Sequence, residues 1–129
     1  MAVNLTSPSS IPPVPGIRIG AADAGIRKSS GEDLVVFAVP ETATIAGVFT
    51  QNKARAAPVE VAIEHLNSAG ARHSGANRAL VINSGNANAG LGSQGIEDCL
   101  AICDMVAAEL KITRDAVLTF STGVFGERL

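Results

Sequence analysis

Alternating blocks of apolar and polar residues predict a chain of short strands. Residues Leu34–Val39 are all apolar and are followed by a proline, which is typical of a buried strand. The apolar run 44–50 predicts a second strand, and the stretch GIRIGAADAG ahead of both suggests a short strand with turns. A third strand is expected at 78–83 and a fourth within AVLTFSTG, residues 116–123.

Two segments repeat apolar side chains with the 3.6-residue period of an α-helix. The first is expected to begin near Pro58 and to end before Gly70. Its apolar stripe consists of Val59, Ile63 and Leu66. His65 lies beside this stripe, where a histidine is expected on the surface or hydrogen-bonded within the fold; a catalytic role is the alternative.

The helix expected after Gly95 carries the clearest pattern in the chain. Its apolar stripe consists of Ile96, Cys99, Leu100, Cys103, Val106, Ala107 and Leu110. Most acidic side chains fall on the other side, and Asp98 suits the positive end of the helix dipole. The order strand, strand, helix, strand, helix, strand indicates an α/β mixture but does not determine the sheet topology.

Composition and charge narrow the class of protein. The chain has 129 residues, of which 47% are hydrophobic and only four are aromatic, all phenylalanine, so the core of one modest domain must be aliphatic. Ten basic against twelve acidic residues, without Tyr or Trp, argue against nucleic-acid binding. No apolar run approaches the roughly 18 residues that span a bilayer, and no signal peptide is evident. We therefore expect no membrane association and a cytoplasmic location, with residues 1–16, rich in Pro and Ser, as a flexible lead-in.

The two cysteines, Cys99 and Cys103, are four residues apart on the second helix. They are either a metal or redox pair or, as we expect, two small buried hydrophobic residues. A zinc site would need two further ligands, and His65 and His73 do not have the spacing of ligands. The sequence therefore predicts no metal.

The segment from Gly90 to Gly95 reads G-x-G-x-x-G, the pattern of a dinucleotide-binding turn. Such a turn places its first glycine directly after a strand, whereas here residues 83–89 intervene. No carboxylate ends the following strand to hold a ribose, so the dinucleotide interpretation fails. The Asn- and Gly-rich loop is then either a tight strand-to-helix connection or a rigid wall that presents amide groups to a site.

The sequence FSTG places a hydroxyl and a glycine at the end of the fourth strand. Thr122 and Gly123 could donate hydrogen bonds to an oxyanion that develops during acyl transfer, and a simple Ser/Thr turn is the alternative. No serine or cysteine has a histidine nearby in a recognisable pattern, so the nucleophile is not evident.

In combination, five stretches resemble the bifunctional ornithine acetyltransferase / glutamate N-acetyltransferase family of arginine biosynthesis. They are GIRIGAADAGIRKSSGEDLVVFAV, ATIAGVFTQNKARAAPV, ALVINSGNANAG, GSQGIEDC and STGVFGE. The resemblance implies an N-terminal part of a four-layered α/β/β/α fold similar to N-terminal-nucleophile hydrolases. It also implies transfer of an acetyl group from N-acetylornithine to glutamate through an acetyl-threonine enzyme. The nucleophile is a threonine released by autocatalytic cleavage of an Ala-Thr bond, no cofactor is required, and acetyl-CoA is a possible co-substrate.

The resemblance places the oxyanion hole at Thr122 and Gly123. The cleavage site and the nucleophilic threonine have no counterpart in the chain, so we expect residues 17–129 to be an incomplete domain, the N-terminal portion of the α chain. The missing C-terminal part or β chain would be its partner, in a hetero-oligomer of αβ units, and the 129-residue chain alone should be inactive. A non-catalytic remnant or interaction module and a self-cleaving aminopeptidase of related fold are the alternatives.

Overall fold

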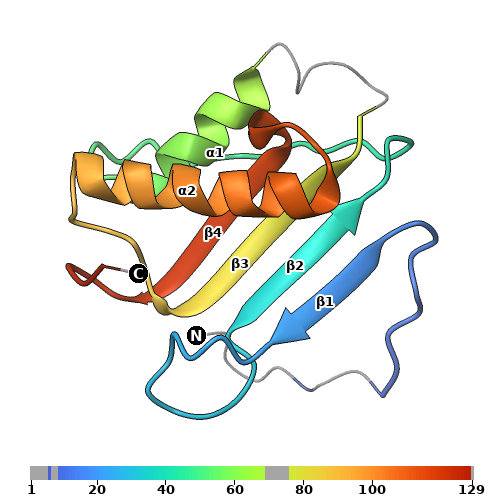
Figure 1. Cartoon of the computed structure of the whole chain (residues 1–129), viewed down its shortest axis with the longest axis horizontal. Helices are drawn as coiled ribbons and strands as arrows, with labels where there is room; N and C mark the ends of the chain where they lie inside the picture. Colours follow the sequence, from blue (N-terminus) through green and yellow to red (C-terminus); the bar gives the residue numbers. More distant parts are fainter. Residues whose placement is uncertain (1–5, 7–8, 69–75, 129) are drawn as a thin grey trace.

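A computed structural model describes residues 6, 9–68 and 76–128, and folds them into one sheet with two helices on one of its faces (Figure 1). The elements in chain order are β1 (Arg18–Ala22), β2 (Leu34–Val39), α1 (Ala57–Asn67), β3 (Arg78–Asn86), α2 (Ser93–Leu110), the 3₁₀ turn η1 (Arg114–Ala116) and β4 (Val117–Val124). The four strands lie in the order β1-β2-β3-β4. Neighbours are antiparallel except β3 and β4, which are parallel and joined through α2.

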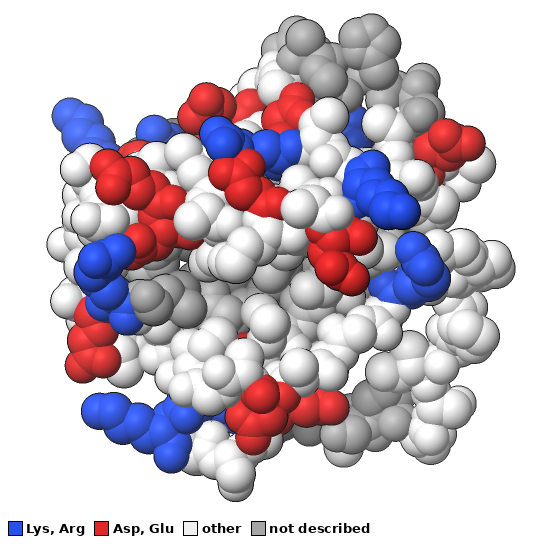
Figure 2. Space-filling model, in the orientation of Figure 1, with Lys and Arg blue, Asp and Glu red and all other residues white. Residues whose placement is uncertain are grey.

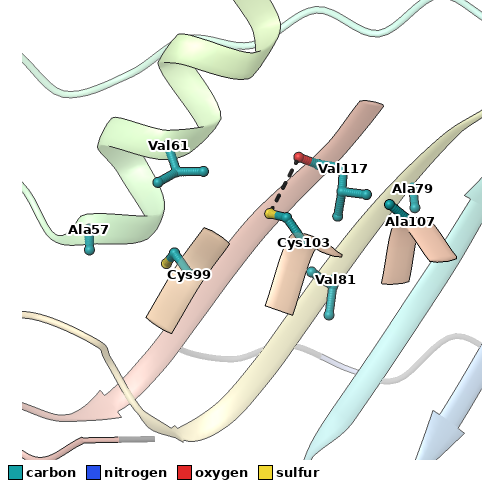
Figure 3. Close-up of a cluster of buried hydrophobic side chains, with 8 residues drawn as sticks. All are labelled: Ala57, Val61, Ala79, Val81, Cys99, Cys103, Ala107 and Val117. Carbon is teal, nitrogen blue, oxygen red and sulfur yellow. Dashed lines mark hydrogen bonds between the residues drawn. The ribbon is translucent and has the colours of Figure 1, made fainter. Parts of the chain in front are cut away.

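The core lies between the sheet and the two helices and is built from small side chains (Figure 3). Its buried members are Ala57, Val61, Ala79, Val81, Cys99, Cys103, Ala107 and Val117. Small residues let the helices approach the strands closely, which is how a chain with so few aromatic residues forms a dense core. The expected aliphatic core and the expected burial of both cysteines are confirmed.

The opposite face of the sheet also carries apolar side chains. Pairing aligns Ile19 with Phe37 and Phe37 with Leu80, and alternation turns these residues away from the helix-facing Val36 and Val81. Both helices of the described chain cover the other face (Figure 1), and Ile19 is 63% exposed. The structure therefore presents an apolar surface on its second side.

Several predicted elements are confirmed with small changes at their ends. The strand at Leu34–Val39 is β2, and the strand within AVLTFSTG is β4. The strand predicted at 78–83 continues to Asn86, and the helix predicted after Gly95 begins at Ser93. Part of the proposed lead-in, residues 1–5 and 7–8, lies outside the described residues.

The prediction of a strand at 44–50 is wrong. These residues form neither helix nor strand, and Val48 is fully exposed. Both edges of β2 are already occupied, by β1 and by β3, so the segment that follows β2 finds no partner strand there. Without a partner an apolar run cannot satisfy its backbone groups as a strand, and the segment instead connects β2 to α1.

The prediction of which side chains of α1 face the core is also wrong. The helix buries Ala57, Val61 and His65, which share one face, while the predicted stripe of Val59, Ile63 and Leu66 is only partly buried. The ring nitrogen Nδ1 of His65 lies 2.7 Å from the carbonyl oxygen of Val117 on β4. This bond gives the buried polar ring a partner, and it confirms the interpretation of His65 as a residue hydrogen-bonded within the fold.

Candidate functional site

The ends of β3 and β4 bring together the two polar segments that the sequence analysis singled out. Because these strands are parallel, their carboxyl ends lie at the same edge of the sheet (Figure 1). The register pairs Ser84 with Thr122 and Gly85 with Gly123. The Asn-rich segment, residues 83–88, thus lies directly beside the predicted oxyanion hole.

Thr122 and Gly123 are both exposed at this edge. Gly123 adopts a φ of 138°, a backbone conformation that side chains disfavour. A Cβ at this position would lie 2.2 Å from the carbonyl carbon of Gly85 and 2.5 Å from the amide nitrogen of Asn86. Only glycine permits this close approach, so the geometry of the strand ends depends on residue 123.

Three buried asparagines hold the segment that follows β3. Asn83 donates from Nδ2 to the carbonyl oxygen of Asn86 at 2.8 Å. The Oδ1 of Asn86 accepts the backbone N–H of Asn88 at 2.7 Å, and its Nδ2 donates to the carbonyl oxygen of Glu127 at 2.8 Å. The amides therefore bond mainly to neighbouring backbone, which makes this segment a rigid part of the fold.

Asn88 ties this segment to both helices. Its Nδ2 donates to the carbonyl oxygen of Gly95 at 2.9 Å and to Sγ of Cys99 at 3.1 Å. Its own carbonyl oxygen accepts the backbone N–H of Ala57 at 3.2 Å. Asn88 is 1% exposed and has a φ of 45°, a conformation that asparagine tolerates better than most residues. The segment is thus a strand-to-helix connection that lies beside Thr122 and Gly123, and its amide groups donate within the protein.

The turn between β1 and β2 supports the same edge, although no motif in the sequence pointed to it. The Asp33 carboxylate, 3% exposed, accepts backbone N–H groups of Arg27 at 2.8 Å and Ala24 at 2.7 Å, and these bonds hold its pKa below the ordinary value. The carbonyl oxygen of Asp33 accepts the N–H of Ser84 at 2.8 Å. Asp33 follows a Gly- and Ser-rich turn and directly precedes an apolar strand, and this position was the sequence signal that could have identified it.

The glycine pattern from Gly90 to Gly95 does not form a dinucleotide turn in its expected context. The strand is longer than predicted, so the intervening loop shrinks to residues 87–89, but the first glycine still does not follow the strand directly. The described residues contain no cluster of His, Cys, Asp or Glu that could hold a metal ion.

Charges on the surface are mixed in sign. Figure 2 shows acidic and basic side chains interspersed over the helix-covered face. Arg128 donates to the carboxylate of Asp98 on α2 at 2.7 Å and thereby holds the pKa of Asp98 below its ordinary value. Among the described helices, none combines the length and the apolar character needed to cross a membrane.

Comparison with known proteins gives one consistent family. A model of the ArgJ family matches residues 18–129. The chain is 42% identical to the arginine biosynthesis bifunctional protein ArgJ of Colwellia psychrerythraea and 45% identical to that of Neisseria meningitidis. All of the chain aligns with each, but it spans only 32% and 31% of their lengths.

Two solved structures share the fold. Ornithine acetyltransferase of Mycobacterium tuberculosis, solved with ornithine, superposes with a TM-score of 0.80 at 35% identity, over 89% of this chain and 60% of that one. The bifunctional protein ArgJ of Bacillus halodurans gives a TM-score of 0.76 at 32% identity, over 89% of this chain and 57% of that one. The predicted fold class, an α/β arrangement of the N-terminal-nucleophile-hydrolase-like type, is confirmed.

Proposed function

Because the chain belongs to the ArgJ family of arginine biosynthesis, we propose that it supplies the oxyanion hole of an acetyltransferase. The donors are the hydroxyl or main chain of Thr122 and the backbone N–H of Gly123. One observation carries this proposal: β4 ends in an exposed Thr-Gly pair whose glycine is locked against Gly85. Preorganised donors of this kind stabilise the charge that develops on a carbonyl oxygen in acyl transfer.

The proposed reaction moves an acetyl group from N-acetylornithine to glutamate. A threonine hydroxyl, activated by its own free α-amine, attacks the acetyl carbonyl and forms a tetrahedral oxyanion. The oxyanion collapses, the acetyl group stays on the threonine, and ornithine leaves with a proton on its amine. The glutamate amine then attacks the acetyl-threonine, N-acetylglutamate leaves, and the proton lost by the amine returns to the threonine oxygen and restores the hydroxyl. Acetyl-CoA is a possible alternative donor, and no cofactor is needed.

The nucleophile belongs to a part of the protein outside these 129 residues. The chain spans about a third of the length of the curated relatives it matches, and no segment of it resembles the family's Ala-Thr cleavage motif. We therefore expect the 129-residue chain alone to transfer no acetyl group. The active form would join it to the segment or β chain that carries the threonine, in an oligomer of αβ units located in the cytoplasm.

The clearest test is Thr122→Val in the protein extended to the full length of its relatives. If the Thr122 hydroxyl is a donor, the loss should lower kcat about 100-fold, because each donor of an oxyanion hole typically contributes that much. Thr122→Ser keeps the hydroxyl and is the matched control. Gly123→Pro is unsuitable, since proline cannot adopt the φ of 138° found there.

Four outcomes separate the candidate functions. Acetyl transfer that falls in Thr122→Val and persists in Thr122→Ser supports the proposal. Turnover in Thr122→Val equal to that of the unmodified protein refutes a role for the hydroxyl. Peptide hydrolysis without acetyl transfer would indicate the aminopeptidase alternative, and a folded full-length protein without either activity would indicate a non-catalytic module.

A further inference from the structure

We infer that Asn83 is a positioning residue that holds Thr122 and Gly123 in place, an inference that rests on the proposed function. Asn83 lies on the central strand β3, on the face toward the helices, and is 5% exposed. The register places it directly opposite Ser121 of β4. It does not reach the proposed oxyanion itself, and acts through Ser121.

Two hydrogen bonds of one amide connect the strand ends. The hydroxyl of Ser121 donates to Oδ1 of Asn83 at 2.5 Å. Nδ2 of Asn83 donates to the carbonyl oxygen of Asn86 at 2.8 Å. The first bond fixes β4 one residue before Thr122, and the second spans Gly85 on the same strand. The side chain of Asn83 thus bonds both to the end of β3, at Asn86, and to β4, at Ser121. We call this pair of bonds the clamp.

The clamp lies where the regular strand pairing fails. Pairing is in register up to Gly85 and Gly123, and then shifts, so that Asn86 opposes both Thr122 and Val124. An irregular ladder determines the local geometry less strictly than a regular one. Beyond the shift, the N–H of Ala87 donates to the carbonyl oxygen of Val124 at 2.9 Å. Before the shift, the side chain of Asn83 holds β4 through its bond to Ser121.

Empty space beside the clamp makes this constraint necessary. An apolar cavity of about 290 Å³ is lined by Asn83 and Ser121 together with residues of β2 and α2, among them Val36 and Ile102. Packing alone therefore does not block a shift of the β4 end toward α2. If the amide of Asn83 moved into this cavity, it would lose both partners in apolar surroundings, which is unfavourable. The hydrogen bonds thus select one position for the strand end.

The test uses Ser121 rather than Asn83, because Asn83→Ala would also enlarge the cavity. In the full-length protein, Ser121→Ala should lower kcat roughly 10- to 100-fold and leave the KM for N-acetylornithine within about twofold, since small misplacements of catalytic groups cost this much. Ser121→Thr keeps the hydroxyl and should restore kcat. Thr119→Val is the matched control: Thr119 is buried two residues earlier on the same face, and its hydroxyl contacts only Cys99 Sγ, at 3.9 Å, among the bonds of the described residues.

Amide hydrogen exchange in residues 119–126 gives a second readout that does not depend on activity. Exchange should be faster in Ser121→Ala than in Thr119→Val. Unchanged exchange and kcat in Ser121→Ala, or equal losses of kcat in both variants, would overturn the inference and indicate a structural role only. If the unmodified protein transfers no acetyl group, the proposed function fails, and the exchange difference alone decides whether Asn83 and Ser121 form the clamp.

Discussion

Gly123 on β4 lies so close to the backbone of Gly85 on β3 that position 123 has no room for a side chain. They are register partners in the parallel pair, and both have positive φ angles, 112° and 138°. A Cβ on Gly123 would lie 2.2 Å from the carbonyl carbon of Gly85, far inside any real contact. The close pairing of these glycines brings the two strand ends together beside Thr122.

Gly123→Ala should destabilise the protein by more than about 3 kcal/mol. The positive φ alone costs an alanine roughly 1–2 kcal/mol, and the contact with the Gly85 backbone adds to it. Gly126→Ala is the matched control, because Gly126 has a φ of 75° but nothing within 4 Å of an added Cβ. Urea unfolding of the two variants measures the difference, and equal losses of stability would contradict the tight contact at Gly123.

Asn88→Ala should lower the free energy of unfolding by about 2–3 kcal/mol. The substitution removes the bonds to Gly95 and Cys99 and places an alanine at a φ of 45°. Asn67→Ala, which removes an exposed amide bonded within α1, should change stability by less than about 0.5 kcal/mol. Chemical denaturation compares them, and a similar effect of the two would show that Asn88 does not anchor the helices.

The two cysteine thiols should be unreactive in the folded protein. Burial raises the pKa of both, and that of Cys103 to about 12, so almost no thiolate is present at pH 8. A thiol-specific reagent should label Cys99 and Cys103 only after denaturant is added. Labelling of the native protein at the rate of a free cysteine would contradict the burial of the two thiols. Labelling of the native protein that becomes faster when a chelator is added would indicate a bound metal.

Asp33 should make stability depend on pH in the acid range. Backbone N–H donors lower its pKa in the folded state below 3.8, the ordinary value for an aspartate. Its contribution to stability is therefore fully present above about pH 4 and is lost as the pH falls through the lower, folded pKa. Asp33→Asn should be less stable at neutral pH and should lose less stability on acidification. Glu64→Gln, at an exposed position on α1, is the control. Thermal unfolding from neutral to acid pH measures both, and parallel profiles for Asp33→Asn and the unmodified protein would refute this role.

The local pattern of apolar residues was sufficient to predict one strand and one helix. The strand at Leu34–Val39 follows from a continuous apolar run that ends at a proline, and the stripe of α2 follows from the 3.6-residue period. Both signals depend only on near neighbours in the chain. The composition likewise determined an aliphatic core with buried cysteines. The placement of Thr122 and Gly123 at the end of a strand was also predicted, and is confirmed by β4.

Only the tertiary structure decided features that depend on distant partners. The segment 44–50 pairs with no strand of the described sheet, in which β1 and β3 occupy both edges of β2. The buried face of α1 includes His65, which bonds to Val117, 52 residues away. Asn83 and Ser121, separated by 38 residues, meet because β3 and β4 run parallel through the α2 crossover. Local propensity contains no information on these partners, since hydrogen bonds across the sheet form between residues that are remote in the chain.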